Sequence, residues 1–128
     1  MKSLPAALTL ASLVLLATPA TASVGGSWRV NGQVADKPFV LDCRFEPRGE
    51  AFAGVCVEVS AGDPRAQAGK SHTVANGVVS GAQVRWSYPV SVLLAKIDIA
   101  FAGSIEGDHM SGVVTAAGRK GAFTAARK

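Results

Sequence analysis

Apolar and polar residues alternate along most of the chain after residue 23, and the pattern is clearest in its last third. Ile97, Ile99 and Phe101 fall on one side of a period-two repeat, with polar or small residues between them. Successive side chains of a strand point to opposite faces, so this alternation predicts a half-buried strand. Gly107 and Gly118 supply residues suited to tight hairpin turns. The chain is therefore predicted to end in three antiparallel strands.

The same alternation predicts five further strands upstream, which makes eight in all. The eight cover residues 25–36, 39–46, 51–59, 71–75, 78–88 and 92–106, followed by two more strands to the end of the chain. Asn76-Gly77 predicts a hairpin turn between the fourth and fifth strands, and Pro89 predicts the end of regular pairing and a bend. Residues 60–70 are polar and contain Gly and Pro, so they predict an exposed loop.

Two cysteines, Cys43 and Cys56, lie in the second and third predicted strands. If Gly49-Glu50 forms a two-residue loop, the hairpin places these cysteines directly opposite each other, within the usual Cα separation of about 5.5–6 Å. A cysteine pair in an exported chain normally oxidises. We therefore predict a structural disulfide, which stabilises the fold by about 3 kcal/mol on the chain-entropy model.

Eight antiparallel strands joined mainly by hairpins predict an all-β fold. We expect an eight-stranded up-and-down β-barrel with one disulfide, because closure removes exposed strand edges. A β-sandwich of two sheets is the alternative. Phe101 and Phe123 are expected to point inward, into a barrel that either fills with side chains or holds one small ligand.

The first 22 residues have the pattern of a secretory signal peptide. Lys2 provides a positive start, residues 6–17 an apolar stretch too short to span a bilayer, and Ala20-Thr21-Ala22 a small-residue cleavage motif. Cleavage before Ser23 would leave one domain, residues 23–128, without a membrane span. We expect a periplasmic or secreted protein.

The formal net charge is +4, and removal of Lys2 lowers it to +3. The basic residues are scattered apart from Arg119-Lys120 and Arg127-Lys128. A nucleic-acid-binding surface usually has a basic stripe with interleaved aromatic residues, which this chain lacks, so no nucleic acid is expected as a partner. The basicity indicates a solvated surface, with anionic envelope components as the alternative.

Gly26-Ser27-Trp28 near the start of the domain and Arg127 near its end resemble the calycin superfamily of lipocalins, fatty-acid-binding proteins and avidins. The resemblance implies that Trp28 closes one end of the barrel and that Arg127 packs across it, a good cation–π geometry. The chain is shorter than a typical lipocalin and shows no C-terminal helix. Small periplasmic inhibitor barrels share its size, signal peptide and single disulfide.

Catalytic motifs are missing from the sequence. It has no Gly-x-Ser-x-Gly elbow, zinc-protease helix, phosphate-binding loop or dinucleotide fingerprint. No pattern pairs His72 or His109 with a nucleophile, and we expect His109 to be exposed and idle. The sequence indicates no metal and no cofactor. It favours a non-enzyme, with a small barrel enzyme of the isomerase or cyclase type kept as a second alternative.

The candidate ligand-binding residues are Trp86, Tyr88 and Arg85. Two aromatic side chains with polar tips and one cation suit an amphipathic or carboxylate-bearing ligand. The competing interpretation is that Trp86 and Tyr88 are core residues and Arg85 faces solvent. We expect an exported barrel that binds a small apolar or amphipathic molecule. The alternative is an envelope inhibitor or protein-interaction module that acts through residues 60–70 or a barrel end on an envelope protein partner.

Overall fold

The computed structural model describes residues 23–61 and 68–128 and contains nine strands there, so the predicted signal peptide lies outside the described residues. The strands are β1 (Gly26–Val34), β2 (Lys37–Arg48), β3 (Ala51–Ala61), β4 (Ser71–Thr73), β5 (Ala75–Ser80), β6 (Gln83–Val92), β7 (Ala95–Glu106), β8 (His109–Ala116) and β9 (Arg119–Arg127). Of the predicted loop 60–70, residues 60 and 61 belong to β3, and residues 62–67 lie outside the described residues.

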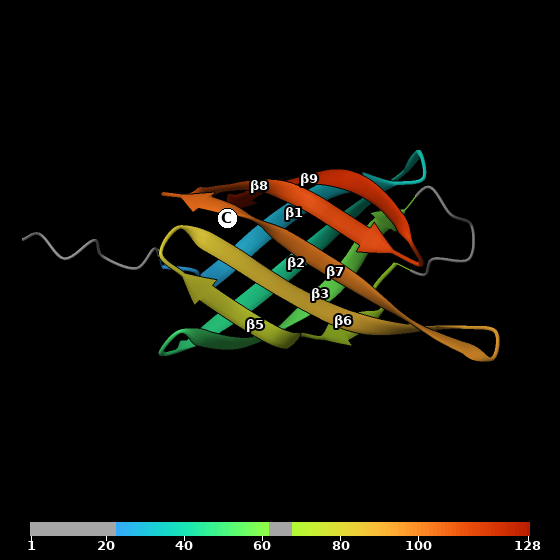
Figure 1. Cartoon of the computed structure of the whole chain (residues 1–128), viewed down its shortest axis with the longest axis horizontal. Coiled ribbons are helices and arrows are strands. Elements are labelled where there is room, and N and C mark those ends of the chain that lie inside the picture. The colour runs from blue at the N-terminus through green and yellow to red at the C-terminus, as the bar shows by residue number, and fades with distance from the viewer. Residues whose placement is uncertain (1–22, 62–67) are drawn as a thin grey trace, which may run out of the picture.

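Eight of these strands form a closed antiparallel barrel, as predicted (Figure 1). The sheet order is β2-β1-β9-β8-β7-β6-β5-β3-β4, and pairing of β2 with β3 closes the ring. The ninth strand, β4, has only three residues. It pairs with one part of β3, and β5 pairs with the neighbouring part of the same strand. The alternating pattern therefore produced a barrel rather than a two-sheet sandwich.

The β2–β3 hairpin has the predicted two-residue turn and carries the predicted disulfide. Arg48 pairs with Ala51 across the turn, and Cys43 pairs with Cys56 in the same register. The bridge is formed, with Cα atoms 4.0 Å apart. This separation is shorter than expected because the cysteines occupy a non-hydrogen-bonded pair, the position where antiparallel strands approach most closely.

The predicted hairpin at Asn76-Gly77 is wrong. Both residues lie inside β5, where the register against β6 shifts and Asn76 has a positive φ of 54°. The turn follows instead at Gly81-Ala82, since Ser80 pairs with Gln83. A Cβ on Gly77 would lie 2.4 Å from the carbonyl oxygen of Phe52. The Asn-Gly pair therefore forms a bulge that lets β5 cross close to β3.

Pro89 does not end pairing, which corrects the second turn prediction. It lies inside β6, opposite Asp98, and the turn comes at Leu93-Leu94. The Val92–Ala95 pair next to the turn is hydrogen-bonded, and hydrogen-bonded and non-hydrogen-bonded pairs alternate from there along the two strands. The Pro89–Asp98 pair is therefore non-hydrogen-bonded, and the proline nitrogen points away from β7. The last β6 pairing with β5 is at Ser87. The nitrogen of Pro89 therefore needs no partner, and a proline is tolerated there.

The barrel has two ends of different composition. One, here the tryptophan end, holds both ends of the described chain, Trp28, and the turns at residues 49–50, 81–82 and 107–108. The other, the histidine end, holds His72 and the turns at residues 35–36, 93–94 and 117–118. The two sets of turns lie at opposite ends of the barrel in Figure 1.

Candidate functional site

At the tryptophan end, Trp28 and Arg127 close the barrel. Trp28 is fully buried, and its indole nitrogen donates a hydrogen bond to the Val24 carbonyl oxygen at 2.8 Å. Arg127 pairs with Trp28 across β1 and β9, and its guanidinium carbon lies 4.3 Å from the indole centroid. The same guanidinium donates to Asp108, to the Ser23 carbonyl oxygen and to the Gly25 carbonyl oxygen. The described N-terminal segment is thereby held across this end.

A surface ion pair joins β1 to β2 near the same end. Arg29 donates two hydrogen bonds to the carboxylate of Asp42, at 2.9 and 3.0 Å, and Lys128 lies 3.2 Å from the same carboxylate. The hydrogen bond from Arg29 lowers the pKa of Asp42. Since these groups are largely exposed, the network adds little to stability.

The middle of the barrel is filled with aromatic side chains. Trp86 is 2% exposed and stacks on Phe101 with ring centroids 4.7 Å apart. Phe45, Phe52 and Phe123 surround it in edge-on contacts, with ring centroids 5.1–6.4 Å from that of Trp86. Phe101 and Phe123 therefore point inward, as predicted. Because the rings fill the middle of the barrel, a ligand inside it would have to bind near one of the two ends.

The predicted ligand residues do not gather at one place. Trp86 lies in the aromatic core, and Tyr88 lies one inward position nearer the histidine end, 4% exposed. Arg85 is exposed on the outer wall, as the competing interpretation expected for that residue. The predicted cation is thus absent from the described interior near Tyr88.

A histidine and a glutamate lie side by side inside the histidine end. His72 is the one buried residue among the described polar and charged residues, with its side chain 5% exposed. Its ring stacks on Tyr88, with centroids 4.5 Å apart and an interplanar angle of 15°. His72 Nε2 lies 3.6 Å from Glu58 Oε1, which is beyond hydrogen-bonding distance. We call Glu58, His72 and Tyr88 the polar cluster.

Two atoms of the polar cluster are buried without a hydrogen-bond partner. They are His72 Nε2 and Glu58 Oε2, and the only other such side-chain atom in the described chain is Trp86 Nε1. Burying a polar group without a partner costs about 1–3 kcal/mol, and more for a charged group. The cluster therefore holds one carboxylate oxygen and one imidazole nitrogen whose hydrogen-bonding capacity is unused within the described residues.

The burial of Tyr88 has an electrostatic consequence. Removal from water raises the pKa of its phenol well above the ordinary value, and the neighbouring carboxylate of Glu58 raises it further. The phenol stays neutral across the physiological range. Together with Glu58, it makes the polar cluster attractive to a cation.

Local strand geometry explains how these residues meet. Glu58 follows Phe52, Gly54 and Cys56 at intervals of two in β3, so its side chain enters the barrel. His72 pairs with Cys56 in β4 and shares its inward face. The alternation in the sequence already indicated that Glu58 points inward. The prediction from the sequence placed only Phe52, Gly54 and Cys56 on that face and did not consider Glu58. His72 carried no such signal, because β4 is too short to show a repeat.

Partly buried apolar side chains lie on the strands at the same end of the barrel. Val34, Phe39, Val90 and Ile99 pack against the core without being fully covered. Glu58 itself keeps 18% of its side chain exposed. The histidine end therefore combines partly exposed apolar side chains with a mostly buried polar cluster, a combination suited to an amphipathic ligand.

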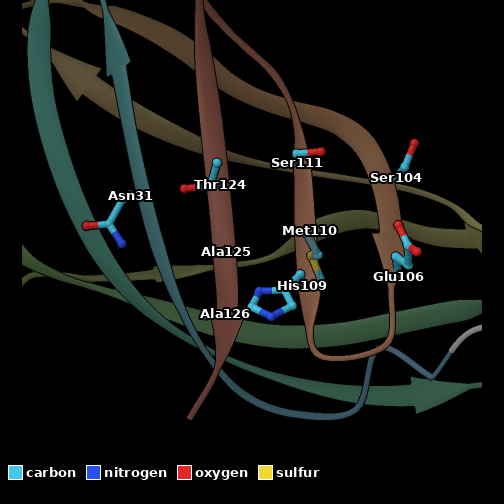
Figure 2. A pocket seen from close by; sticks show the side chains of 9 residues that line it. All are labelled: Asn31, Ser104, Glu106, His109, Met110, Ser111, Thr124, Ala125 and Ala126. Atoms are coloured by element: carbon cyan, nitrogen blue, oxygen red, sulfur yellow. The ribbon is translucent and has the colours of Figure 1, made fainter.

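A shallow groove lies on the outer wall, across β1, β9, β8 and β7, and has a volume of about 340 Å³ (Figure 2). Its floor carries a row of polar side chains from adjacent strands, in which Ser104 pairs with Ser111, Ser111 with Thr124, and Thr124 with Asn31. His109 and Glu106 border the groove and are exposed. The polar side chains of the groove, Asn31, Ser104, Ser111 and Thr124, are all exposed to solvent.

The two histidines differ in their surroundings, since His72 is buried beside Glu58 and His109 is exposed at the start of β8. In residues 23–61 and 68–128, no group of three or more His, Cys, Asp or Glu side chains could hold a metal ion. The described residues also contain no helix long and apolar enough to cross a membrane. Hydrogen bonding and charge recognition are the chemistry that the polar cluster itself can provide.

The sequence matches no protein-family model and no curated protein. The closed barrel is consistent with a calycin-like fold, to which the Trp28–Arg127 contact adds a local likeness. Function therefore has to be inferred from the chemistry of the two barrel ends.

Proposed function

We propose that this barrel binds a small amphipathic amine at its histidine end. The observation that carries the proposal is the pair of buried, unpartnered atoms, Glu58 Oε2 and His72 Nε2. A protonated amine can donate to a carboxylate oxygen and to the free nitrogen of a neutral imidazole at the same time. The stacked rings of His72 and Tyr88 lie directly beside these atoms.

The charge of the interior favours an amine over the carboxylate-bearing ligand that Arg85 suggested. Arg85 faces solvent, whereas Glu58 faces inward, where its closest basic neighbour within the polar cluster is His72. A second carboxylate placed beside Glu58 would be repelled in a site of low dielectric. The apolar part of an amine would lie against the rim formed by residues such as Phe39 and Ile99.

We also infer that the chain is exported, to the periplasm or outside the cell, and that it belongs with lipocalin- or avidin-type calycins. Export is supported by the N-terminal pattern and by the disulfide, which is consistent with an oxidising compartment. The calycin assignment is supported by the closed barrel and the Trp28–Arg127 contact.

The experiment compares two probes that differ only in the head group, octylamine and octanoate. Calorimetry should detect octylamine binding to the disulfide-bonded protein and at least tenfold weaker binding of octanoate. Glu58→Gln keeps the shape of the side chain but removes its charge, and should weaken octylamine binding at least tenfold.

The matched control is Glu106→Gln, which neutralises an exposed carboxylate on the outer wall. This variant should bind octylamine as the unaltered protein does. Equal binding of the two probes, or unchanged octylamine affinity in Glu58→Gln, would overturn the proposal.

A further inference from the structure

The hairpin of β6 and β7 extends beyond the barrel wall as a two-stranded arm. Pairing of β7 with β8 begins at Ile99, and pairing of β6 with β5 ends at Ser87, yet β6 and β7 continue to pair as far as Val92 and Ala95. The four residues of β7 before Ile99 span about 13 Å at 3.3 Å per residue. Figure 1 shows this hairpin projecting past the other strands at the histidine end.

The tip of the arm consists of Leu93 and Leu94, and both are fully exposed, at 94% and 106%. The chain also accepts an unfavourable backbone here, since Leu93 has a φ of 57°. Glycine is the residue that tight turns prefer at such a position, and a bulky side chain there is an outlier. Exposed apolar surface and an unfavourable conformation coincide at one tip, which indicates selection for a role outside the fold.

Basic side chains predominate on the surface of the barrel end from which the arm projects. The exposed charged residues of the described histidine end are Lys37, Lys70, Lys96, Arg119 and Lys120, with Asp36 and Asp98. We call the five cations the basic collar. An apolar tip that projects from the same barrel end as these cations matches the layered chemistry of an anionic bilayer, whose charged head groups cover an apolar interior.

We propose that the Leu93-Leu94 tip inserts into anionic lipid surfaces while the basic collar contacts the head groups. A convex tip needs no complementary pocket in its partner, and the bilayer interface supplies none. Pro89 protects the unpaired edge of β6 in the arm. Its nitrogen has no hydrogen to donate, so it cannot pair with a strand from another molecule. This surface role stands apart from ligand binding by the polar cluster, since the tip and the cluster share no residue.

The test is co-sedimentation of the protein with large vesicles, either pure phosphatidylcholine or phosphatidylcholine containing about one third phosphatidylglycerol. The protein should sediment with the anionic vesicles, at least tenfold more strongly than with the neutral ones, and raised salt should release it. The double variant Leu93→Gly/Leu94→Ser should lose at least tenfold in binding to the anionic vesicles.

The double variant also separates docking from folding. Glycine suits the positive φ at residue 93, so the variant should unfold at the same temperature as the unaltered protein or above it. Val113→Ser is the matched control, because Val113 is an exposed apolar residue of the barrel wall, 46% exposed. It should leave vesicle binding unchanged.

Three results would overturn the proposal. The first is the absence of sedimentation with anionic vesicles, and the second is equal sedimentation of the double variant. The third is a purified protein partner that binds the tip, and loses binding in the double variant, while vesicles bind neither form. The octylamine experiment does not depend on any of these outcomes, so the two proposals can fail separately.

Discussion

The two ends of the barrel differ in how their buried polar groups are satisfied. At the tryptophan end, the Trp28 indole reaches a carbonyl oxygen, and Arg127 donates to three acceptors while lying over the indole ring. At the histidine end, Glu58 and His72 each bury an atom without a hydrogen-bond partner. Natural proteins tend to break local rules where function requires it, so the contrast fits a stabilising role for the tryptophan end and the binding role that we propose for the histidine end.

The largest effect is expected from Trp28→Ala at the tryptophan end. Loss of a fully buried indole removes its packing and leaves a cavity, which should lower the free energy of unfolding by about 3–5 kcal/mol. Urea unfolding followed by circular dichroism measures this. Leu94→Ala, at an exposed position, should change stability by less than about 0.5 kcal/mol. Similar losses in both variants would contradict the division of roles.

Arg127→Ala should have the next largest effect. It removes the cation–π contact and the hydrogen bonds to the N-terminal segment, at a cost of about 2 kcal/mol. The corresponding fall in Tm is about 10 °C for a domain of this size, measurable by calorimetry. Octylamine binding should be unchanged. Arg119→Ala at the histidine end should leave the Tm unaltered, and an unaltered Tm in Arg127→Ala would argue against its role in closure.

Alkaline pH should test the burial of the histidine end. The pKa of Tyr88 is raised in the folded protein above its value of about 10 in the unfolded chain. The neutral phenol therefore contributes its full stabilisation below about pH 10, and this contribution is lost as the pH rises above that value. Stability should fall by about 1.4 kcal/mol per pH unit above pH 10. The chain has 1 tyrosine, so tyrosinate absorbance at 295 nm reports Tyr88 alone. Ionisation near pH 10 in the folded state would show that water reaches the phenol.

The smallest effect, and one of opposite sign, is expected from Glu58→Leu. An apolar side chain removes a buried carboxylate oxygen that lacks a partner, so the free energy of unfolding should rise by about 1 kcal/mol while octylamine binding is lost. Urea unfolding and calorimetry measure the two quantities. Glu106→Leu on the outer wall should change neither. A marked loss of stability in Glu58→Leu would mean that the carboxylate supports the fold.

Much of the barrel could be predicted from the sequence, because period-two alternation reports strands whose faces differ in burial. The disulfide register followed from a two-residue turn between Cys43 and Cys56. The turn errors have a local cause, since Asn76-Gly77 and Pro89 carry signals for turns as well as for bulges and free edges. Whether such a residue forms a turn or a bulge depends on the strands beside it. The contact of Phe52 in β3 with Gly77 in β5 is an example that the local sequence does not reveal.

The candidate site was less predictable than the fold. Of the three candidate ligand residues, Trp86 and Tyr88 are buried, and Arg85 faces outward, as the competing interpretation expected. Glu58 was missed, although its position in the alternation placed it inward. The meeting of Glu58 with His72 depends on pairing across β3 and β4, which joins residues separated by the 62–67 segment. Contacts of this kind depend on tertiary structure, so no single stretch of sequence encodes them.

The pairing of β1 with β9 also has a kinetic consequence. Most neighbouring strands are joined by two-residue turns and can pair locally, whereas the Trp28–Arg127 pair brings together the two ends of the described chain. Joining distant segments carries a large loop-closure entropy before any contact compensates for it, so this step should be among the last in folding. Before that step, β1 and β9 expose two unpaired edges on each molecule. Refolding yield should therefore fall as protein concentration rises, because those edges can pair between chains as well as within one.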